Sequence, residues 1–402
     1  MSTLPSIAPH PAPVAPTLDP SVVVEHEPWW RTRRADLLAL SEEGTARYVY
    51  HLPTARAAAR RLRALPPVER VLYAVKANPH PDLLRLFHGE GLGFECVSPG
   101  EVRHVLSVLP DLDPAAILFT PNFAPRSEYA WAYDVGVRVT LDNAYGLVHW
   151  PEVFAGRALI LRVDPGEGYG HHEHVRTAGK ASKFGIAPED LPEVADRVRE
   201  LGARVVGLHA HVGSGIAETH VWAETAAALA RYAPLFPDAT VLDLGGGLPV
   251  PDDPGAARFD VDAAAAHLAA FQQDPPRFGL WLEPGRYLAA EAGVLLARVT
   301  QLKAKGDAVY VGVDAGMHTL IRPALYGTRH EIVNLTRLDA PNAITAEIVG
   351  PICESGDVLG RARRLPKTRE GDVLLIANTG AYGQAMASRY NLREPAAESV
   401  LG

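Results

Sequence analysis

The sequence predicts an α/β protein in which a (β/α)8 TIM-like barrel is followed by a smaller antiparallel β domain. Its 402 residues exceed the roughly 250–300 that one hydrophobic core organises, so two domains are expected. Up to about residue 291, eight short apolar segments alternate with Ala/Leu/Arg-rich, helix-like segments. This alternation is typical of a parallel sheet covered by helices, and eight units suggest a closed barrel.

The predicted barrel strands are short and mostly apolar. They lie at residues 71–77, 93–98, 116–120, 137–142, 159–164, 205–213, 240–247 and 280–286. The segment between the fifth and sixth strands illustrates the helix signals, with Pro188 and two acidic residues at its start and Gly202 just past its end. We therefore assign residues 53–291 to the barrel.

From about residue 292 strand-like segments follow one another without room for helices, so residues 292–402 are predicted to form the β domain. A further strand at 46–52 precedes the barrel, and we expect the segment 25–52 to join that domain. Residues 1–24 are rich in Pro and Ala, lack the features of a secretory signal, and are expected to form a flexible tail. Fewer than about 50 residues precede the first barrel unit, so we expect no further enzyme domain before it.

Composition narrows the class of function. No apolar run approaches the roughly 20 residues that span a bilayer, and the net charge of −8 argues against a nucleic-acid surface. Two cysteines, Cys96 and Cys353, exclude a disulfide framework. We expect a cytoplasmic protein that acts on a small molecule, with neither membrane nor nucleic acid as its partner.

Polar residues fall at the carboxyl ends of the predicted strands, where barrel enzymes place their active sites. They are Lys76, Glu95, His209, His211, the glycines 245–247, and Glu283 with Arg286. A lysine within the apolar run YAVKA needs a partner or a lowered pKa, and either suits an amine that attacks an aldehyde. Taken alone, Lys76 is more typical of a lysine that reaches solvent from a strand end than of a catalytic amine.

The other motifs also have two readings each when taken singly. The glycine-rich turn 243–249 places backbone N–H groups where a phosphate can approach, but such glycines also serve tight turns. HVGSG (211–215) offers an imidazole for stacking and a hydroxyl for a phosphate, or a core histidine. EPGRY (283–287) offers a carboxylate and a guanidinium, or an ordinary ion pair.

Six segments in order resemble the signatures of the fold-type III pyridoxal phosphate (PLP) decarboxylases, the family that contains ornithine and diaminopimelate decarboxylases. They are YAVKAN (73–78), HVGSG (211–215), GGG (245–247), EPGRY (283–287), GPICES (350–355) and GAYG (380–383). The resemblance runs from about Ala46 to the C-terminus and implies an alanine-racemase-like barrel. Residues 182–186, 313–332, 353–357 and 390–398 resemble the diaminopimelate branch.

This resemblance implies a PLP cofactor and a role for each matching residue. Lys76 would hold the cofactor as a Schiff base and His211 would stack on the pyridine ring. Glu283 would keep the ring nitrogen protonated, so that the ring accepts the electrons released as the Cα–carboxylate bond breaks. The phosphate would be held by Ser214, Gly246, Gly247, the Gly285–Arg286 backbone and Tyr382.

On the substrate side the resemblance implies decarboxylation of meso-2,6-diaminopimelate to L-lysine and CO2. Arg286, Arg322 and Tyr326 would bind the distal carboxylate, Glu354 the distal ammonium, and Tyr382 would lie near the substrate. Cys353 would protonate the carbon that loses CO2. In this family that cysteine and its neighbouring glutamate come from the partner subunit, so a homodimer with shared active sites is implied.

Two departures stand out. The family commonly has Asp where this chain has Glu95, which weakens any inferred contact of that residue with the cofactor. The segment 164–185 contains His171, His172 and His174, but no Cys or Asp completes a ligand set with local spacing. We therefore expect no metal and interpret the segment as a polar loop over the cofactor.

Other functions remain open from the sequence: a decarboxylase of ornithine, lysine, arginine or a carrier-bound acyl amino acid, an amino-acid racemase, or a catalytically silent regulatory homologue. Arg322 and Glu354 favour a distal amino-acid group. A silent homologue has no chemical need for both Lys76 and Cys353, and a racemase has none for the CES motif. Cys96, within a strand, is interpreted as a core thiol.

Overall fold

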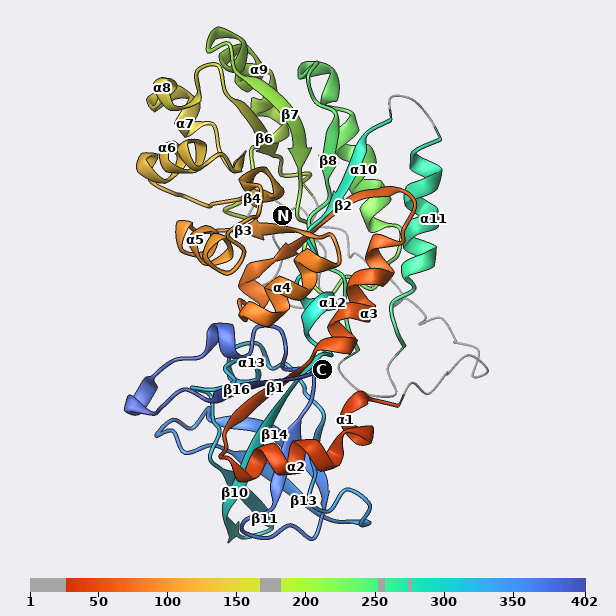
Figure 1. Cartoon of the computed structure of the whole chain (residues 1–402), viewed down its shortest axis with the longest axis vertical. Coiled ribbons are helices and arrows are strands. Elements are labelled where there is room, and N and C mark those ends of the chain that lie inside the picture. Colours follow the sequence, from red (N-terminus) through yellow and green to blue (C-terminus); the bar gives the residue numbers. More distant parts are fainter. Residues whose placement is uncertain (1–26, 167–181, 252–256, 274–276) are drawn as a thin grey trace, which may run out of the picture.

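The structure is a computed structural model that describes residues 27–166, 182–251, 257–273 and 277–402. Eight parallel strands close into a barrel in sequence order, as predicted, and form the upper unit in Figure 1. The barrel strands are β2 (Val68–Ala74), β3 (Gly93–Cys96), β4 (Ile117–Phe119), β5 (Arg138–Leu141), β6 (Ala158–Arg162), β7 (Arg204–His209), β8 (Val241–Asp243) and β9 (Gly279–Leu282).

Helices between these strands cover the outside of the barrel (Figure 1). They are α3 (Leu52–Arg63), α4 (Pro81–Gly89), α5 (Pro99–Val108), α6 (Arg126–Val135), α7 (Tyr145–His149), α8 (Pro151–Phe154), α9 (Leu191–Glu200), α10 (Val221–Ala230), α11 (Val261–Phe271) and α12 (Arg286–Ala289). Helix α9 shows why they form, because Leu191, Val194, Ala195 and Val198 are buried at helical spacing. Gly202, at φ +60°, lies just beyond its end.

The interior of the barrel is filled by side chains rather than by a channel. Leu72, Leu118, Ile160 and Trp281, from β2, β4, β6 and β9, form a buried cluster of their own. Their neighbours along the strands pack in the main core instead, as Val71 and Tyr73 do beside Leu72. This alternation is expected of barrel strands, and the packed interior leaves the strand ends as the place for chemistry.

The lower unit in Figure 1 is an eight-stranded sheet. Its strands are β1 (Arg47–His51), β10 (Gly293–Lys305), β11 (Ala308–Val313), β12 (Ile332–Asn334), β13 (Asn342–Val349), β14 (Val358–Pro366), β15 (Val373–Ile376) and β16 (Ala397–Leu401). Short helices α1 (Trp29–Thr32), α2 (Arg34–Glu42) and α13 (Arg322–Tyr326) complete it. None of the helices among the described residues is long and apolar enough to cross a membrane.

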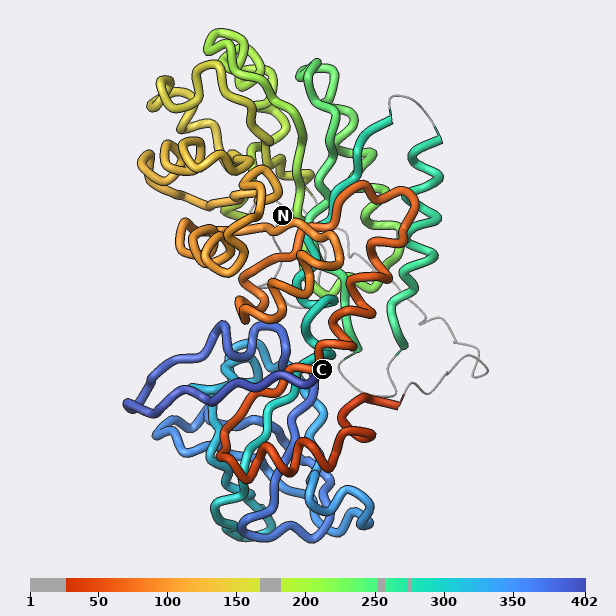
Figure 2. Tube along the Cα trace, in the orientation of Figure 1, coloured from red at the N-terminus to blue at the C-terminus, as the bar shows by residue number. Residues whose placement is uncertain are grey.

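Strand β1 lies inside this sheet, antiparallel to β10 and parallel to β16. Figure 2 shows the chain passing from β1 upward into the barrel and returning to the lower unit much later. We predicted an antiparallel sheet. Most of its strand pairs are antiparallel, but β1–β16 and β11–β13 run parallel. We also did not anticipate β14 and β16, since the basic run 361–364 and the short final segment lack a clear apolar pattern.

Two hydrogen bonds to backbone carbonyls join the two units next to the barrel mouth. The Asn78 side chain donates from Nδ2 to the Gly380 carbonyl at 2.9 Å, and the Tyr382 N–H donates to the Ala77 carbonyl at 2.7 Å. The YAVKAN and GAYG motifs therefore meet, one from each unit. Residues from the β domain are thus placed beside the carboxyl ends of the barrel strands.

Candidate active site at the barrel mouth

The sequence predicted Lys76 at the end of a strand. It lies instead in a short 3-10 turn, Val75–Ala77, directly after β2. Its Nζ lies 2.9 Å from Glu95 Oε2, and the other oxygen of Glu95 accepts a hydrogen bond from the Thr120 hydroxyl. The Lys76 side chain is 43% exposed whereas that of Glu95 is 1% exposed. A lysine thus reaches open space while a buried carboxylate holds its amine.

Two opposing effects act on the Lys76 amine. Desolvation by the surrounding protein lowers its pKa, but Glu95, with Tyr382 and Glu283, outweighs this and holds the pKa above its ordinary value. Glu95 is therefore the group that keeps the amine charged at rest. It is also the nearest acceptor for the proton that the amine must lose before attacking an aldehyde.

A buried acidic group lies across the mouth, where β7, β8 and β9 end. Glu283 Oε2 is 3.2 Å from His209 Nε2, and both side chains are almost fully buried. Burial raises the pKa of Glu283, but His209, with Lys76 and His211, lowers it more, so the carboxyl is ionised. Burial and the charge on Glu283 raise the pKa of Asp243 well above its usual range. Glu283 is therefore the stronger acid of the two, and the negative charge is favoured on Glu283 rather than on Asp243.

His209, Asp243 and Glu283 also present ligand atoms within 4.8 Å of one another, close enough to surround a metal ion. A metal needs ionised ligands, whereas the raised pKa of Asp243 disfavours its ionised form and Glu283 Oε2 is already paired with His209. Glu283 Oε1 is buried, and among the described residues the one side chain that can share a proton with the Glu283 carboxylate, apart from His209, is a protonated Asp243. A single donor such as a protonated ring nitrogen suits this oxygen better than a metal does.

The glycine-rich turn after β8 lies against the HVGSG segment after β7. The Gly246 N–H donates to His211 Nδ1 at 3.1 Å, and the N–H groups of Gly215 and Ile216 donate to the Gly247 carbonyl at 3.0 and 3.1 Å. Burial, reinforced by Arg162 and Lys76, lowers the pKa of His211 to about 3. His211 is therefore a neutral ring at the mouth, and half-buried Ser214 lies three residues after it in the same segment.

Side chains have no room in this turn. A Cβ at Gly246 would lie 2.5 Å from the Glu283 carbonyl oxygen. We expect Gly246→Ala to lower PLP affinity about tenfold, because the turn must shift to relieve this contact, and the shift moves its backbone away from the phosphate and disturbs the Gly246–His211 hydrogen bond. Absorbance titration of the cofactor-depleted protein measures this. Gly89→Ala is the matched control, since its added methyl meets nothing within 4 Å; equal affinity losses in both variants would contradict the assignment.

Gly285, Arg286 and Tyr382 form the side of the mouth that faces the β domain. The Arg286 guanidinium carbon lies 5.1 Å from the centre of the Tyr382 ring. A Cβ on Gly285 would lie 2.9 Å from the Ala77 methyl carbon and 3.2 Å from the Tyr382 hydroxyl. Gly285 is therefore packed against both the Val75–Ala77 turn, which carries Lys76, and the Tyr382 side chain.

Arginines gather around a buried histidine in the β domain. Arg322, 4% exposed at the start of α13, donates to the Thr328 hydroxyl at 3.5 Å. Arg322, Arg286 and Arg363 all lie close enough to His330 to lower its pKa, although burial is the larger cause, and the pKa falls to about 3. Two of the predicted substrate residues, Arg286 and Arg322, thus flank one buried spot. Tyr326, half-buried, ends the same helix.

Neutral buried histidines make stability depend on pH. His211 and His330 have pKa values of about 3 when folded, against 6.5 ordinarily. The unfolded chain therefore binds more protons, and the free energy of unfolding should decrease as pH falls from about 6.5 toward about 3. We expect a lower melting temperature at pH 5 than at pH 7.5, and a smaller difference in His330→Gln. An unchanged difference in that variant would contradict this.

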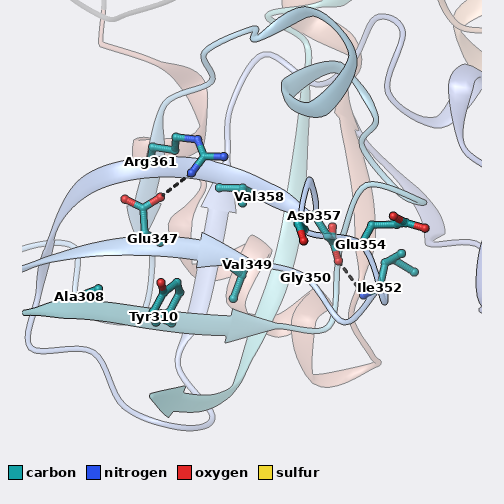
Figure 3. Close-up of a pocket in the computed structure, with 11 residues that line it drawn as sticks. Ala308, Tyr310, Glu347, Val349, Gly350, Ile352, Glu354, Asp357, Val358 and Arg361 are labelled. Carbon is teal, nitrogen blue, oxygen red and sulfur yellow. Dashed lines mark hydrogen bonds and ion pairs between the residues drawn. The ribbon is translucent and has the colours of Figure 1, made fainter. Parts of the chain in front are cut away.

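Cys353 and Glu354 lie on an exposed loop between β13 and β14 (Figure 3 shows Glu354). Their recorded contacts are with Asn391 and Tyr390, not with Lys76. A cavity of about 490 Å³ beside this loop is lined by Glu354, Asp357 and residues of β11, β13 and β14, and includes no barrel residue. The predicted residues thus form two groups, one at the mouth and one on this loop. His171, His172 and His174 lie outside the described residues.

Several residues at the mouth escaped the sequence analysis. Arg162, at the end of β6, lies 3.5 Å from Asp142, donates to the Asn122 side chain at 3.1 Å and lies over the Phe184 ring. Asp142 also accepts the Gly185 N–H at 3.1 Å. The signal was an arginine within the buried run LILRV, the same kind of signal that identified Lys76. Thr120, which holds Glu95, gave no such signal.

The mouth fits PLP, the cofactor expected from the sequence. It combines the accessible Lys76 amine, the buried Glu283 carboxylate, and glycine-rich segments in which an added Cβ atom would collide with neighbouring atoms. Arg286 adds a cation at the start of a helix. Each chemical feature of the cofactor therefore has a counterpart among the described residues.

Comparison with known proteins agrees with this. A family model described as "Pyridoxal-dependent decarboxylase, pyridoxal binding domain" matches residues 54–290. The chain is 39% identical over 385 residues to a diaminopimelate decarboxylase of Methanothermobacter thermautotrophicus, covering 91% of this chain and 89% of that one. It is 35% identical over 374 residues to that of Streptomyces coelicolor, covering 88% and 84%.

Among solved structures, diaminopimelate decarboxylase from Helicobacter pylori complexed with L-lysine superposes with a TM-score of 0.83 at 26% identity, covering 91% of this chain and 94% of that one. Fold, cofactor-binding region and full-length similarity thus point the same way. The chain belongs to the PLP-dependent decarboxylase family, in its diaminopimelate decarboxylase group, and its cofactor is pyridoxal phosphate.

Proposed function

We propose that this chain decarboxylates meso-2,6-diaminopimelate to L-lysine and CO2. The observation that carries the proposal is a pair of arginines beside the mouth: Arg286 lies over the Tyr382 ring, and Arg322 is buried at the start of α13. Diaminopimelate differs from lysine and ornithine by a distal carboxylate, and paired arginines suit a carboxylate. The name and full-length similarity of the curated relatives support the same substrate.

PLP supplies a ring that withdraws electrons from the substrate carbon when the carboxylate leaves. The protein's residues do the rest. Lys76 would hold the cofactor aldehyde covalently, with release of water, Glu95 would accept the proton that the amine gives up, and Glu283 would hold a proton on the ring nitrogen. His211 packs on the ring as a neutral imidazole. The phosphate is bound by Ser214, Gly246, Gly247, Gly285, Arg286 and Tyr382.

At the substrate, Arg286, Arg322 and Tyr326 bind the distal carboxylate, and Glu354 binds the distal ammonium. Cys353 delivers a proton to the carbon that has lost its carboxylate. In this arrangement residues 53–291 supply most of the cofactor contacts and Arg286. Residues 292–402, which form the β domain with the segment 25–52, supply Arg322, Tyr326, Cys353 and Glu354 for the substrate and Tyr382 for the phosphate.

The test is CO2 release from meso-diaminopimelate, ornithine, lysine and arginine with PLP present. We expect turnover of diaminopimelate at a kcat/KM at least about a hundredfold above the others, because an arginine site left without its carboxylate partner is unfavourable. Preferred turnover of another member would replace the substrate assignment. Absence of turnover on the whole panel would favour the regulatory homologue.

We further propose a cytoplasmic homodimer with shared active sites, without membrane or nucleic-acid partners. Support comes from the exposed Cys353–Glu354 loop, whose recorded contacts do not include the mouth, and from exposed Tyr390 and Leu392 beside it. Mixing Lys76→Ala chains with Cys353→Ala chains should restore activity, since one of the two sites in each heterodimer keeps both residues. Proven heterodimers without activity would exclude a shared site.

A further inference from the structure

The loop that carries Cys353 and Glu354 has a rigid base. Asp357 is buried, and its carboxylate accepts the N–H groups of Ile352 at 2.6 Å and Met317 at 2.5 Å. Figure 3 shows the Asp357–Ile352 hydrogen bond beneath the loop. Asp357 fixes where the loop starts and ends but does not touch the two side chains at its tip.

The tip is held from the other side by two consecutive residues of a C-terminal turn. Asn391 accepts the Cys353 N–H on Oδ1 at 3.2 Å and donates from Nδ2 to Cys353 Sγ at 3.3 Å. One amide therefore binds both the backbone and the thiol of the same residue. Asn391 has φ +56° and ψ +23°, a left-handed conformation that asparagine tolerates better than most residues.

Tyr390, the residue before Asn391, binds the Glu354 side chain. Tyr390 donates its hydroxyl to Glu354 Oε1 at 2.5 Å. That carboxylate raises the pKa of Tyr390 to about 12, so the phenol stays protonated and remains a donor. With Oε1 occupied, Oε2 is the oxygen left to accept a hydrogen bond from a substrate ammonium.

Isolated polar contacts on a surface are common and contribute little. Here, two adjacent residues bind two adjacent residues, and those two are the proton donor and the ammonium ligand of the proposed function. We propose that Asn391 is a positioning residue for the Cys353 thiol and Tyr390 a positioning residue for the Glu354 carboxylate. This proposal rests on the proposed function.

The arrangement makes the two roles separable. Because Nδ2 donates to the sulfur, the thiol hydrogen cannot point at Asn391 and is directed elsewhere, as a proton donor requires. Loss of Asn391 should therefore slow the chemical step and lower kcat. Tyr390 also interacts with Cys353, but both Asn391 hydrogen bonds to that residue remain when the Tyr390 hydroxyl is lost. The main effect of that loss should therefore be weaker substrate binding, which raises KM.

The decisive experiment is a double-mutant cycle on the full-length holoenzyme. Asn391→Gly keeps the left-handed backbone and removes both hydrogen bonds, and we expect kcat to fall about tenfold at nearly unchanged KM. Cys353→Ala should leave only a slow residual turnover, and in that background the same substitution should change the residual kcat less than about twofold, because the group that it positions is gone. Equal losses in both backgrounds, or no loss in the first, would overturn the role of Asn391.

Ala362→Gly is the matched control, because Ala362 also has a left-handed backbone (φ +49°) but lies in β14 and is bonded to Glu347. It should keep wild-type kcat. Tyr390→Phe should raise KM for diaminopimelate about tenfold with kcat within about twofold, since a bond to a charged group is lost. An unchanged KM would overturn the role of Tyr390.

A measurement without substrate separates this proposal from the proposed function. Hydrogen exchange of the peptide that contains the Cys353 amide should be faster in Asn391→Gly than in the wild type and in Ala362→Gly. Faster exchange in a protein that decarboxylates none of the amino acids would show the positioning contact and refute the function. Unchanged exchange in an active enzyme would refute the contact and leave the function standing.

Discussion

Replacing Lys76 with alanine is expected to abolish both CO2 release and the visible absorbance of covalently bound cofactor. The reason is the position of the Lys76 amine. It reaches the mouth of the barrel, its Nζ lies 2.9 Å from Glu95 Oε2, and it interacts electrostatically with Glu283. Alanine leaves Glu95 buried without that partner but removes no packed core side chain, so the fold should persist. Absorbance spectra and CO2 release measure the two effects.

Lys303→Ala is the matched control, because Lys303 is exposed on β10 in the other unit. It should retain both the spectrum and the activity. A Lys76→Ala protein that keeps the visible absorbance after dialysis would show that another lysine binds the cofactor. A protein that loses the absorbance and retains full turnover would contradict covalent binding as a requirement.

The second large effect is expected at Glu283. Glu283→Gln removes the charge that holds a proton on the ring nitrogen, and we expect kcat to fall by about 10²–10³, the range found when one preorganised electrostatic group is lost. Cofactor binding should persist, since Lys76 and the glycine turn are unaltered. Glu224→Gln, on the exposed surface of α10, should retain wild-type kcat.

Asp243 complicates the single substitution in an informative way. Its pKa is raised by burial and by the Glu283 charge, so removal of that charge makes Asp243 more acidic. Asp243 can then supply part of the missing anion. The double variant Asp243→Asn, Glu283→Gln carries no anion here and should be less active than Glu283→Gln; wild-type turnover in the double variant would refute the ring-nitrogen role.

The barrel could be predicted because its information is local. A buried parallel strand appears as a short apolar run, and helices with caps and apolar stripes separate the runs. The carboxyl ends of such strands meet at one edge whatever the exact boundaries. Lys76, His211 and Glu283 therefore came together even though Lys76 lies in the turn after β2 rather than in the strand.

What could not be predicted depends on contacts between distant segments. Asn391 and Cys353 are bonded across the β domain, and Thr120 holds Glu95 from a neighbouring strand. The motif YNLREPAAE indicated a branch of the family but gave no physical reason for its asparagine. Parallel pairing of β1 with β16 was hidden for the same reason, because no local pattern specifies which strands become neighbours.

The position of β1 has a consequence for how the molecule is made. This strand is synthesised before the whole barrel, yet both of its neighbours, β10 and β16, follow the barrel. On a ribosome, β1 has two unpaired edges until those segments emerge, so the barrel can close before the sheet that flanks it. Arg322, Tyr326 and Glu354, together with Tyr382, therefore join the site after Lys76, His211 and Glu283, which the barrel positions by itself.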